Sequence, residues 1–188
     1  MTLSKTGPHR HGVHFYEDSA SLCRMVARFL AEGLTTGDPA IVVATPPHQE
    51  QIVEQLRSRL IDVGSAQRSG ALVFLDADET LGVCMVGGNP DPGLFASYIG
   101  TVLGQLARIK PQSTVRAYGE MVDLLWKTGQ TEAAVKLEIL WNALASKYRF
   151  SLLCGYAMGH FYKEPDAYAR VCSEHSDVWP NDGLRAGS

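Results

Sequence analysis

The chain has 188 residues, of which 45% are hydrophobic, and a formal net charge of −3. This length and composition are typical of one globular domain with a substantial core. The slightly acidic balance argues against nucleic acid as a direct partner, because nucleic-acid binding needs a basic face. No apolar run approaches the about 20 residues that cross a bilayer, and the N-terminus lacks the apolar stretch of a signal peptide, so we expect a cytoplasmic protein without membrane contact.

Strands and helices are predicted to alternate along the chain. A strand at 12–16 is followed by a helix with apolar residues at helical spacing, which Asp18 or Ser19 is expected to cap. Residues 40–44 are small and β-branched apolar residues in an unbroken run, typical of a strand buried on both faces of a parallel sheet. Thr45 is expected to cap the next helix, which has prolines in its first turn.

The second half of the chain continues this alternation. A third strand at 71–75 ends at Asp76, and a short helix is expected from Asp78 or Glu79 to Val86. The remaining predicted elements are a loop at 87–92, a helix around 95–106, a strand at 114–119, a helix at 131–148, a strand at 150–156 and a last helix around 168–175.

This order of elements predicts an α/β fold of three layers, with a mainly parallel sheet and helices on both of its faces. We expect a single domain over residues 12–178. A flexible N-terminus, 1–11, and a flexible polar tail, 179–188, are expected on either side of it.

The carboxyl ends of the predicted strands indicate where a ligand would bind, because open parallel sheets bind ligands beyond that edge. The strand that ends in Gly119 and Glu120 places an ionisable group there. The ligand-binding residues that we expect at or near this edge are His14, Tyr16, Glu17, Thr45, Asp76, Glu120 and Tyr156.

Several of these residues also have a purely structural interpretation. His14 and Tyr16 share one face of their strand, either as a polar pair in a pocket or with the histidine bonded to a carboxylate or carbonyl in the core. Glu120 is equally suited to the start of a helix. If Glu120 is buried, its pKa should rise unless His14 offsets the effect. We expect Asp123 at the surface or as a cap.

The strong helix at 131–148 carries Glu138, Trp141 and Asn142. Together with Trp126 these residues fit an aromatic-walled pocket or a partner surface. The simpler interpretation, which we favour, places the tryptophans in the core and Glu138 in solvent.

Metal binding has weak support in the sequence. The four cysteines are widely spaced and expected to be reduced, a spacing that does not favour a structural zinc cluster. Cys172 and His175 lie three residues apart on a predicted helix, a spacing that can share a metal or a haem, but only two ligands are evident there. His14, Cys154 or His160 would complete such a site only if the fold brings them close, and packing explains the pair better.

Two further groups also have both a functional and a structural interpretation. Cys154 lies in an apolar strand, where a thiol usually acts as a small hydrophobe. Asp76, Asp78 and Glu79 are a group of oxygen ligands suited to Mg²⁺, but without a phosphate nearby they fit a solvated turn and helix cap better.

The segments GDPAIVVAT, LDADETL, YGEMVDLLW, LEILWNAL and SLLCGY, in this order, resemble the MEDS domain, the methanogen/methylotroph DcmR sensory domain. The resemblance covers about Val13 to His175. It implies descent from the RecA/KaiC type of ATPase and a sensory input module that is often attached to kinases or DNA-binding domains. It also implies small-molecule ligands, including hydrocarbon derivatives.

The segment from Tyr16 to Leu22 departs from the ATPase pattern. A phosphate-binding loop needs the pattern GxxxxGK[ST], whereas this segment has no glycine or lysine and contains two acids. We therefore expect a non-enzymatic sensory module without an assigned cofactor. It would bind a small molecule at the sheet edge and signal by conformational change to a partner protein or a fused kinase or DNA-binding domain. The alternatives are a degenerate nucleotide-binding protein with residual ATPase activity and an oligomeric protein-interaction module.

Overall fold

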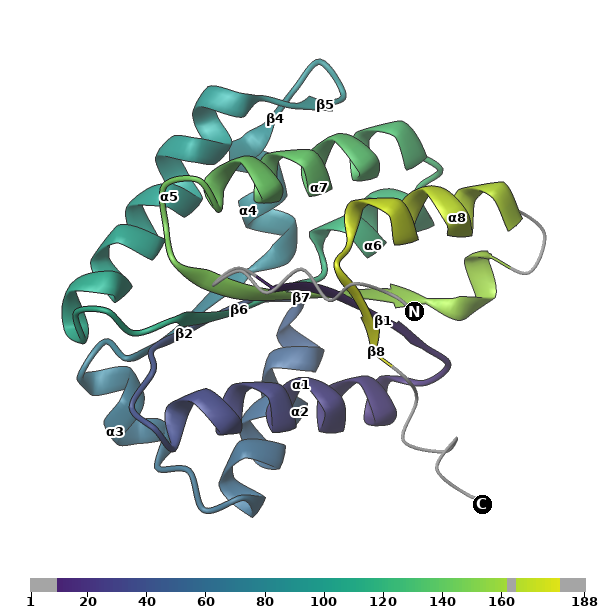
Figure 1. Ribbon diagram of the computed structural model, residues 1–188. Coiled ribbons are helices and arrows are strands. Elements are labelled where there is room, and N and C mark those ends of the chain that lie inside the picture. The colour runs from purple at the N-terminus through teal and green to yellow at the C-terminus, as the bar shows by residue number, and fades with distance from the viewer. Residues whose placement is uncertain (1–9, 162–164, 180–188) are drawn as a thin grey trace, which may run out of the picture.

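The computed structural model describes residues 10–161 and 165–179 and is built around a parallel sheet of six strands. The strands follow the order β3-β2-β6-β7-β1-β8 across the sheet (Figure 1). Their bounds are β1 Arg10–Tyr16, β2 Ala40–Ala44, β3 Leu72–Asp76, β6 Val115–Gly119, β7 Phe150–Ala157 and β8 Asp177–Trp179.

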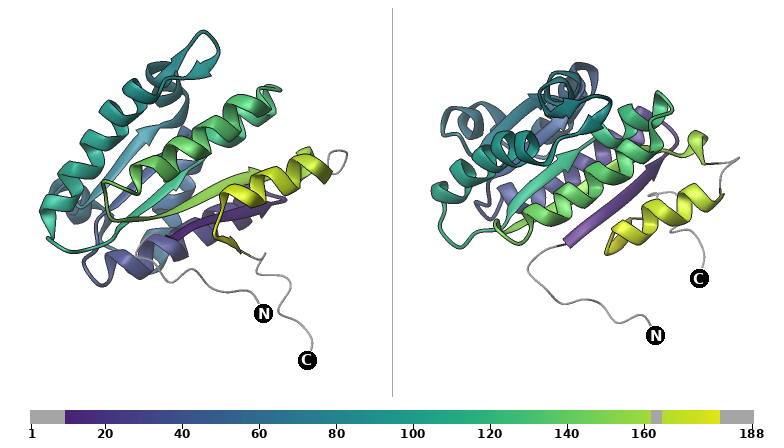
Figure 2. Two further views of the ribbon diagram at one scale, coloured as in Figure 1. Left: turned by 45° about the horizontal axis from the view of Figure 1, so that its top comes forward. Right: turned by 90° about the horizontal axis from the view of Figure 1, so that it is seen from above.

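Helices cover both faces of this sheet, which confirms the predicted three-layer α/β fold (Figure 1). One face carries α1 Ser19–Leu34, α2 Pro46–Ser58 and α3 Val63–Arg68. The other carries α4 Ala77–Cys84, α5 Pro92–Ile109, α6 Met121–Lys127, α7 Thr131–Leu144 and α8 Pro165–Glu174, with a short 3₁₀ helix at Met158–His160. Figure 2 shows α7 and α8 running side by side over the part of the sheet that contains β7 and β1.

The strand β2 shows why the sheet is buried on both faces. All five of its side chains are fully buried. Ile41 and Val43 pack into the core beneath α4–α8, whereas Ala40, Val42 and Ala44 pack into the core beneath α1–α3. Alternate side chains of one apolar strand thus contribute to two separate hydrophobic cores.

Aspartates begin several helices by accepting a hydrogen bond from a backbone amide. Asp18 accepts from the Ser21 amide at the start of α1, at 2.8 Å, and Asp76 accepts from the Glu79 amide at the start of α4, at 2.9 Å. Asp76 therefore acts as a helix cap, which is the structural role that the sequence favoured over Mg²⁺ binding. Thr45 takes the expected position before α2, but its side chain makes no capping hydrogen bond.

Some elements differ from the sequence prediction. The expected helix end and loop around 85–90 instead form a small hairpin, β4 Met85–Val86 and β5 Asn89–Pro90. It turns at Gly87 and Gly88, whose positive φ values of 56° and 77° favour glycine. The strand β8, which was not predicted, pairs with β1.

The sheet also extends beyond the expected domain limits, because β1 begins at Arg10 and β8 ends at Trp179. The rest of the two expected flexible segments, 1–9 and 180–188, lies outside the described residues. Trp126 and Trp141 are buried, with 6% and 1% of their surface exposed, so they belong to the core rather than to a partner surface.

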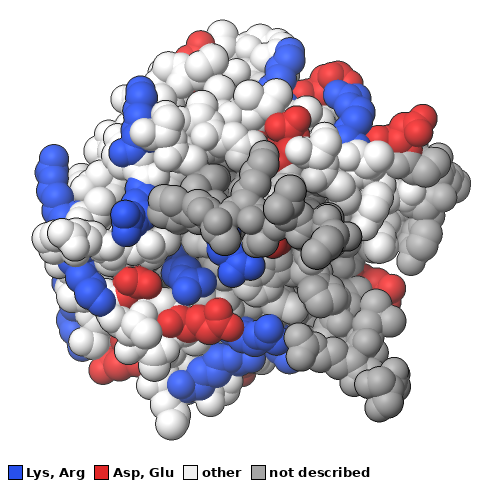
Figure 3. Space-filling view, viewed as in Figure 1, with Lys and Arg blue, Asp and Glu red and all other residues white. Residues whose placement is uncertain are grey.

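Acidic and basic side chains intermingle on the face of the molecule in Figure 3, where neither sign forms an extended patch among the coloured residues. Among the helices that the structure describes, none has the length and apolar character needed to cross a bilayer.

Candidate functional site

Glu120 is the centre of a hydrogen-bonded network at the carboxyl edge of the sheet. It follows β6 and is only 3% exposed. Its Oε1 accepts a hydrogen bond from the Thr45 amide at 2.5 Å. Its Oε2 lies 2.7 Å from His48 Nδ1 and accepts from the Tyr118 hydroxyl at 3.0 Å. His48 Nε2 in turn lies 3.0 Å from Ser19 Oγ, so one carboxylate connects β6 to the first turns of α2 and α1.

The pKa of Glu120 contradicts the expectation from burial. Burial alone would raise it, but the hydrogen bond and charge of His48, together with the Thr45 amide, outweigh burial and hold the pKa below its ordinary value. The expected partner, His14, is not involved. His14 Nδ1 lies 3.2 Å from the backbone carbonyl oxygen of Trp179, which is the core-histidine arrangement.

Asp123 is a second buried carboxylate at this edge, although we expected it at the surface or as a cap. It is 2% exposed and accepts hydrogen bonds from the Tyr16 hydroxyl and the Ala157 amide, each at 2.8 Å. Lys127 Nζ lies 2.7 Å from Asp123 Oδ2. Burial and the neighbouring Asp123 raise the pKa of Tyr16 far above its ordinary value, so the phenol stays protonated and acts as a donor.

The structure thus brings together three of the expected ligand-binding residues, Tyr16, Thr45 and Glu120. The ring of Tyr16 lies edge-on to His48, with centroids 6.4 Å apart, and so joins the two carboxylate networks. Glu17 is exposed at the same edge. The other three contact different groups: His14 the Trp179 carbonyl, Asp76 the Glu79 amide and Tyr156 the Glu138 carboxylate.

His48 is the main residue of this edge that the sequence prediction missed. It lies in the first turn of the helix that follows β2, which places it at the carboxyl edge of the sheet beside the end of β6. That position was available from the sequence and is the signal that would have identified it.

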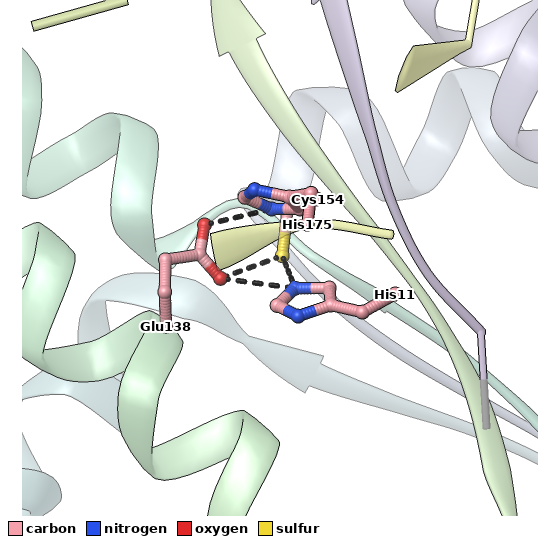
Figure 4. A group of neighbouring side chains, drawn as sticks. All are labelled: His11, Glu138, Cys154 and His175. Atoms are coloured by element: carbon pink, nitrogen blue, oxygen red, sulfur yellow. Dashed lines mark hydrogen bonds and ion pairs between the residues drawn. The ribbon is translucent and has the colours of Figure 1, made fainter. Parts of the chain in front are cut away.

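A second cluster of side chains lies between the sheet and the helices α7 and α8. It consists of His11 from β1, Glu138 from α7, Cys154 from β7 and His175, which follows α8 (Figure 4). Each residue contributes one ligand atom, and the four atoms all lie within 4.8 Å of one another.

Short contacts connect the members of this cluster. His11 Nε2 is 3.1 Å from Glu138 Oε2 and 3.4 Å from Cys154 Sγ. His175 Nε2 is 3.3 Å from Glu138 Oε1, and Cys154 Sγ is 3.3 Å from Glu138 Oε2. Glu138 and Cys154 are fully buried, and His11 is 2% exposed.

The electrostatics of the cluster follow from this burial. Burial alone would raise the pKa of Glu138, but the imidazoles of His175 and His11 outweigh it and hold the pKa far below its ordinary value. Burial would lower the pKa of His175, but Glu138 outweighs it and the pKa is raised. Burial, reinforced by Glu138, raises the pKa of the Cys154 thiol well above its ordinary value.

This cluster corrects the expected position of Glu138 and shows which residues surround His175. Glu138 was expected in solvent, but it is completely buried because it shares the apolar stripe of α7 with Leu137 and Trp141. His175 gathers with three residues from distant segments, among them Cys154, which the sequence suggested as able to complete a site; Cys172, its partner in the weakly supported pair, is not one of the four. The side chain of His160 lies outside the described residues.

The fold and the sequence together define the class of protein. The fold is a parallel α/β sheet between two helical layers, with buried polar networks at its carboxyl edge and beneath α7 and α8. The family model of the MEDS domain, described as "MEthanogen/methylotroph, DcmR Sensory domain", matches residues 10–176. The chain belongs to this family of sensory domains.

Other comparisons add information on the fold alone. An uncharacterized protein, PH0321 from Pyrococcus horikoshii, solved in complex with an unknown peptide, is similar in structure with a TM-score of 0.65 and 13% sequence identity. The similarity covers 89% of this chain and 74% of that protein. A comparison with curated proteins gives no match.

Proposed function

We propose that this sensory domain binds a small molecule at the carboxyl edge of its sheet and signals binding to a partner protein by a shift of α1 and α2. The observation that carries the proposal is the Glu120 carboxylate, which connects β6 to the first turn of α2 through His48 and the Thr45 amide. The contact of His48 with Ser19 extends this connection to α1.

This network couples binding to helix position in a simple way. His48 retains 13% side-chain exposure, so a ligand can reach it from solvent. A ligand that takes over the hydrogen bond between His48 and Ser19 removes the polar link between the first turns of α2 and α1. The arrangement that binds the ligand better is then populated at the expense of the other, which is the change that a partner reads.

The charges at this edge favour a neutral or cationic ligand. A helix N-terminus usually attracts anions. Here the protein's own carboxylates already lie at three of these N-termini: Asp18 at α1, Glu120 at α2 and Asp76 at α4. The connection between β1 and α1 is only Glu17 and Asp18, which leaves no length for a phosphate-binding loop. The same features disfavour nucleotide binding.

A thermal-shift screen tests this proposal. We expect neutral or cationic organic compounds to raise the melting temperature of the chain, whereas ATP with Mg²⁺ does not. A ligand at about 100 times its Kd contributes about 2.7 kcal/mol of stability. The shift should be lost in His48→Ala and kept in the control Glu50→Gln, an exposed site on the same helix. A screen without any stabilising compound, or stabilisation by ATP and Mg²⁺ alone, would refute the proposal.

A further inference from the structure

We infer that His11, Glu138, Cys154 and His175 form a closed binding site for one divalent metal ion of the zinc class. The first support is the convergence of four donor groups from separate elements on one buried point (Figure 4). This inference is independent of the ligand proposed for the carboxyl edge, because the two sites use different residues.

The hydrogen bonds of the two histidines show which ring nitrogen faces the cluster. His175 Nδ1 lies 2.6 Å from the carbonyl oxygen of Val171 and must donate to it. His11 Nδ1 lies 2.8 Å from Asn142 Oδ1, and Asn142 is oriented because its amide nitrogen donates to the Glu174 carbonyl at 3.1 Å. Both Nδ1 atoms therefore carry the hydrogen.

It follows that each neutral imidazole points the lone pair of its Nε2 into the cluster, where the carboxylate oxygens of Glu138 also point. Lone pairs that face one another in a buried space repel unless a proton or a cation lies between them. The side chain of His175 is completely buried, and its Nε2 lies 3.3 Å from Glu138 Oε1, a contact that is an ion pair only when this nitrogen carries a hydrogen. In the neutral form, whose hydrogen is on Nδ1, Nε2 has no hydrogen-bond partner among the described residues. A metal ion would give this nitrogen a partner.

The charges balance in the same arrangement. A metal ion that binds the Cys154 sulfur displaces the thiol proton to solvent. The resulting carboxylate, thiolate and two neutral imidazoles carry two negative charges, which one divalent cation neutralises. This donor set of two nitrogens, one sulfur and one oxygen is suited to zinc, whereas Mg²⁺ and Ca²⁺ prefer oxygen ligands alone.

The distances also suit tetrahedral coordination. Metal–ligand bonds of about 2.0–2.3 Å around a tetrahedral ion place neighbouring ligand atoms about 3.3–3.8 Å apart. Cys154 Sγ lies 3.3 Å from Glu138 Oε2 and 3.4 Å from His11 Nε2, within this range, and His11 Nε2 lies 3.1 Å from Glu138 Oε2, just below it. His175 Nε2 lies 3.3 Å from the other carboxylate oxygen, Oε1, and the four ligand atoms all lie within 4.8 Å of one another. Four protein ligands complete the tetrahedron, which is typical of a structural rather than a catalytic zinc site.

Groups around the four ligands hold them in place. The Tyr156 hydroxyl donates to Glu138 Oε1 at 2.8 Å. Val171 and Asn142 accept the hydrogens of the two histidines, as partners of metal-bound imidazoles usually do. A bound ion would therefore fasten β1 and β7 to α7 and to the segment that links α8 with β8.

The decisive experiment is metal analysis of the full chain without an affinity tag. The chain is first stripped of metal with a chelator and then reconstituted with zinc. We expect elemental mass spectrometry to find about one zinc ion per chain. Cobalt(II) should give the intense visible bands of a tetrahedral site and a thiolate-to-metal charge-transfer band. Failure of the folded wild-type chain to take up either ion, or a weak octahedral cobalt spectrum without the thiolate band, overturns the inference.

Variants identify the ligands. Cys154→Ser should abolish the charge-transfer band, whereas Cys23→Ser and Cys172→Ser, at cysteines outside the cluster, should keep it. Equal loss of the band in either control overturns the assignment. Tyr156→Phe keeps all four ligands and serves if Cys154→Ser does not fold. We expect it to lower metal affinity about 10- to 100-fold, and unchanged affinity would contradict the arrangement.

Discussion

Replacement of Glu120 by glutamine tests the network at the carboxyl edge most directly. The carboxylate receives three hydrogen bonds, from the Thr45 amide, His48 and the Tyr118 hydroxyl. Glutamine keeps one oxygen, which can serve Thr45, but presents an NH₂ group to the other two donors. Hydrogen bonds to a charged group contribute about 1.5–3 kcal/mol each, and reorientation recovers part of that, so we expect a loss of about 2–4 kcal/mol near neutral pH.

The loss should depend on pH in a defined direction. The pKa of Glu120 is lowered in the folded chain from an ordinary value of 4.5. Its stabilising effect is therefore complete above that ordinary value and disappears as pH falls through the lower, folded pKa. The groups that face it are His48, Tyr118 and Tyr16, and tyrosines do not titrate in acid. Because glutamine does not titrate, the stability difference between the two proteins should narrow as pH falls below about 4.5, the ordinary value of this carboxyl group.

Urea unfolding of both proteins, from about pH 7 to about pH 3.5, measures this difference. Glu17→Gln is the matched control, because Glu17 is an exposed carboxylate at the same edge, and it should change stability by less than about 0.5 kcal/mol. A loss below about 0.5 kcal/mol in Glu120→Gln, or a difference that stays constant with pH, would refute the reasoning.

Three further substitutions probe other parts of the fold by urea unfolding. Asp123→Asn removes a buried charge that Lys127 and two hydrogen bonds satisfy, and should destabilise by about 2–4 kcal/mol; a neutral effect would contradict its role. Trp141→Ala should lower the free energy of unfolding by about 3–5 kcal/mol, whereas Ile139→Ala, at an exposed site of the same helix, should lower it by less than about 0.5 kcal/mol. Similar losses at both sites would disprove the core position of Trp141. Gly155→Ala places a methyl group 2.9 Å from the Tyr118 hydroxyl and 3.1 Å from a Leu22 methyl. This crowding should lower the free energy of unfolding by about 1–3 kcal/mol, and a variant as stable as the wild type would show that the site has room for the methyl group.

The sequence predicts the layers of the fold well because apolar pattern determines burial. The run at 40–44 indicates a strand covered on both faces, and β2 is that strand. Short elements have no such pattern. The three residues of β8 become a strand only through their pairing with β1, and the hairpin after α4 depends on two glycines in a segment that otherwise suits a loop.

The candidate sites were only partly predictable, because they depend on contacts between distant segments. Strand direction is enough to place Glu120 at the ligand edge, but the identity of its partner, His48, depends on how β2 lies beside β6. Polar residues on helices are harder still. Asp123 and Glu138 suit an exposed position by residue type alone, and only the packing of α6 and α7 against the sheet shows that they are buried.

The cluster of His11, Glu138, Cys154 and His175 leaves almost no local pattern in the sequence, because its residues come from separate elements. His11 precedes the expected domain, and the counting of cysteines does not detect a site that uses a single one. The buried position of Glu138 was nevertheless available, because it follows Leu137 and lies three residues before Trp141 on the apolar side of α7.

The place of β1 in the sheet has a consequence for how the chain is made. Its neighbours in the sheet are β7 and β8: Arg10 pairs with Ser151 of β7, and Gly12 pairs with Asp177 of β8. A ribosome synthesises β1 before β7 and β8, so the residues that the finished fold buries in this strand have no neighbouring strand until β7 emerges. Pairing of β1 therefore closes long loops of the chain, and such long-range contacts form slowly.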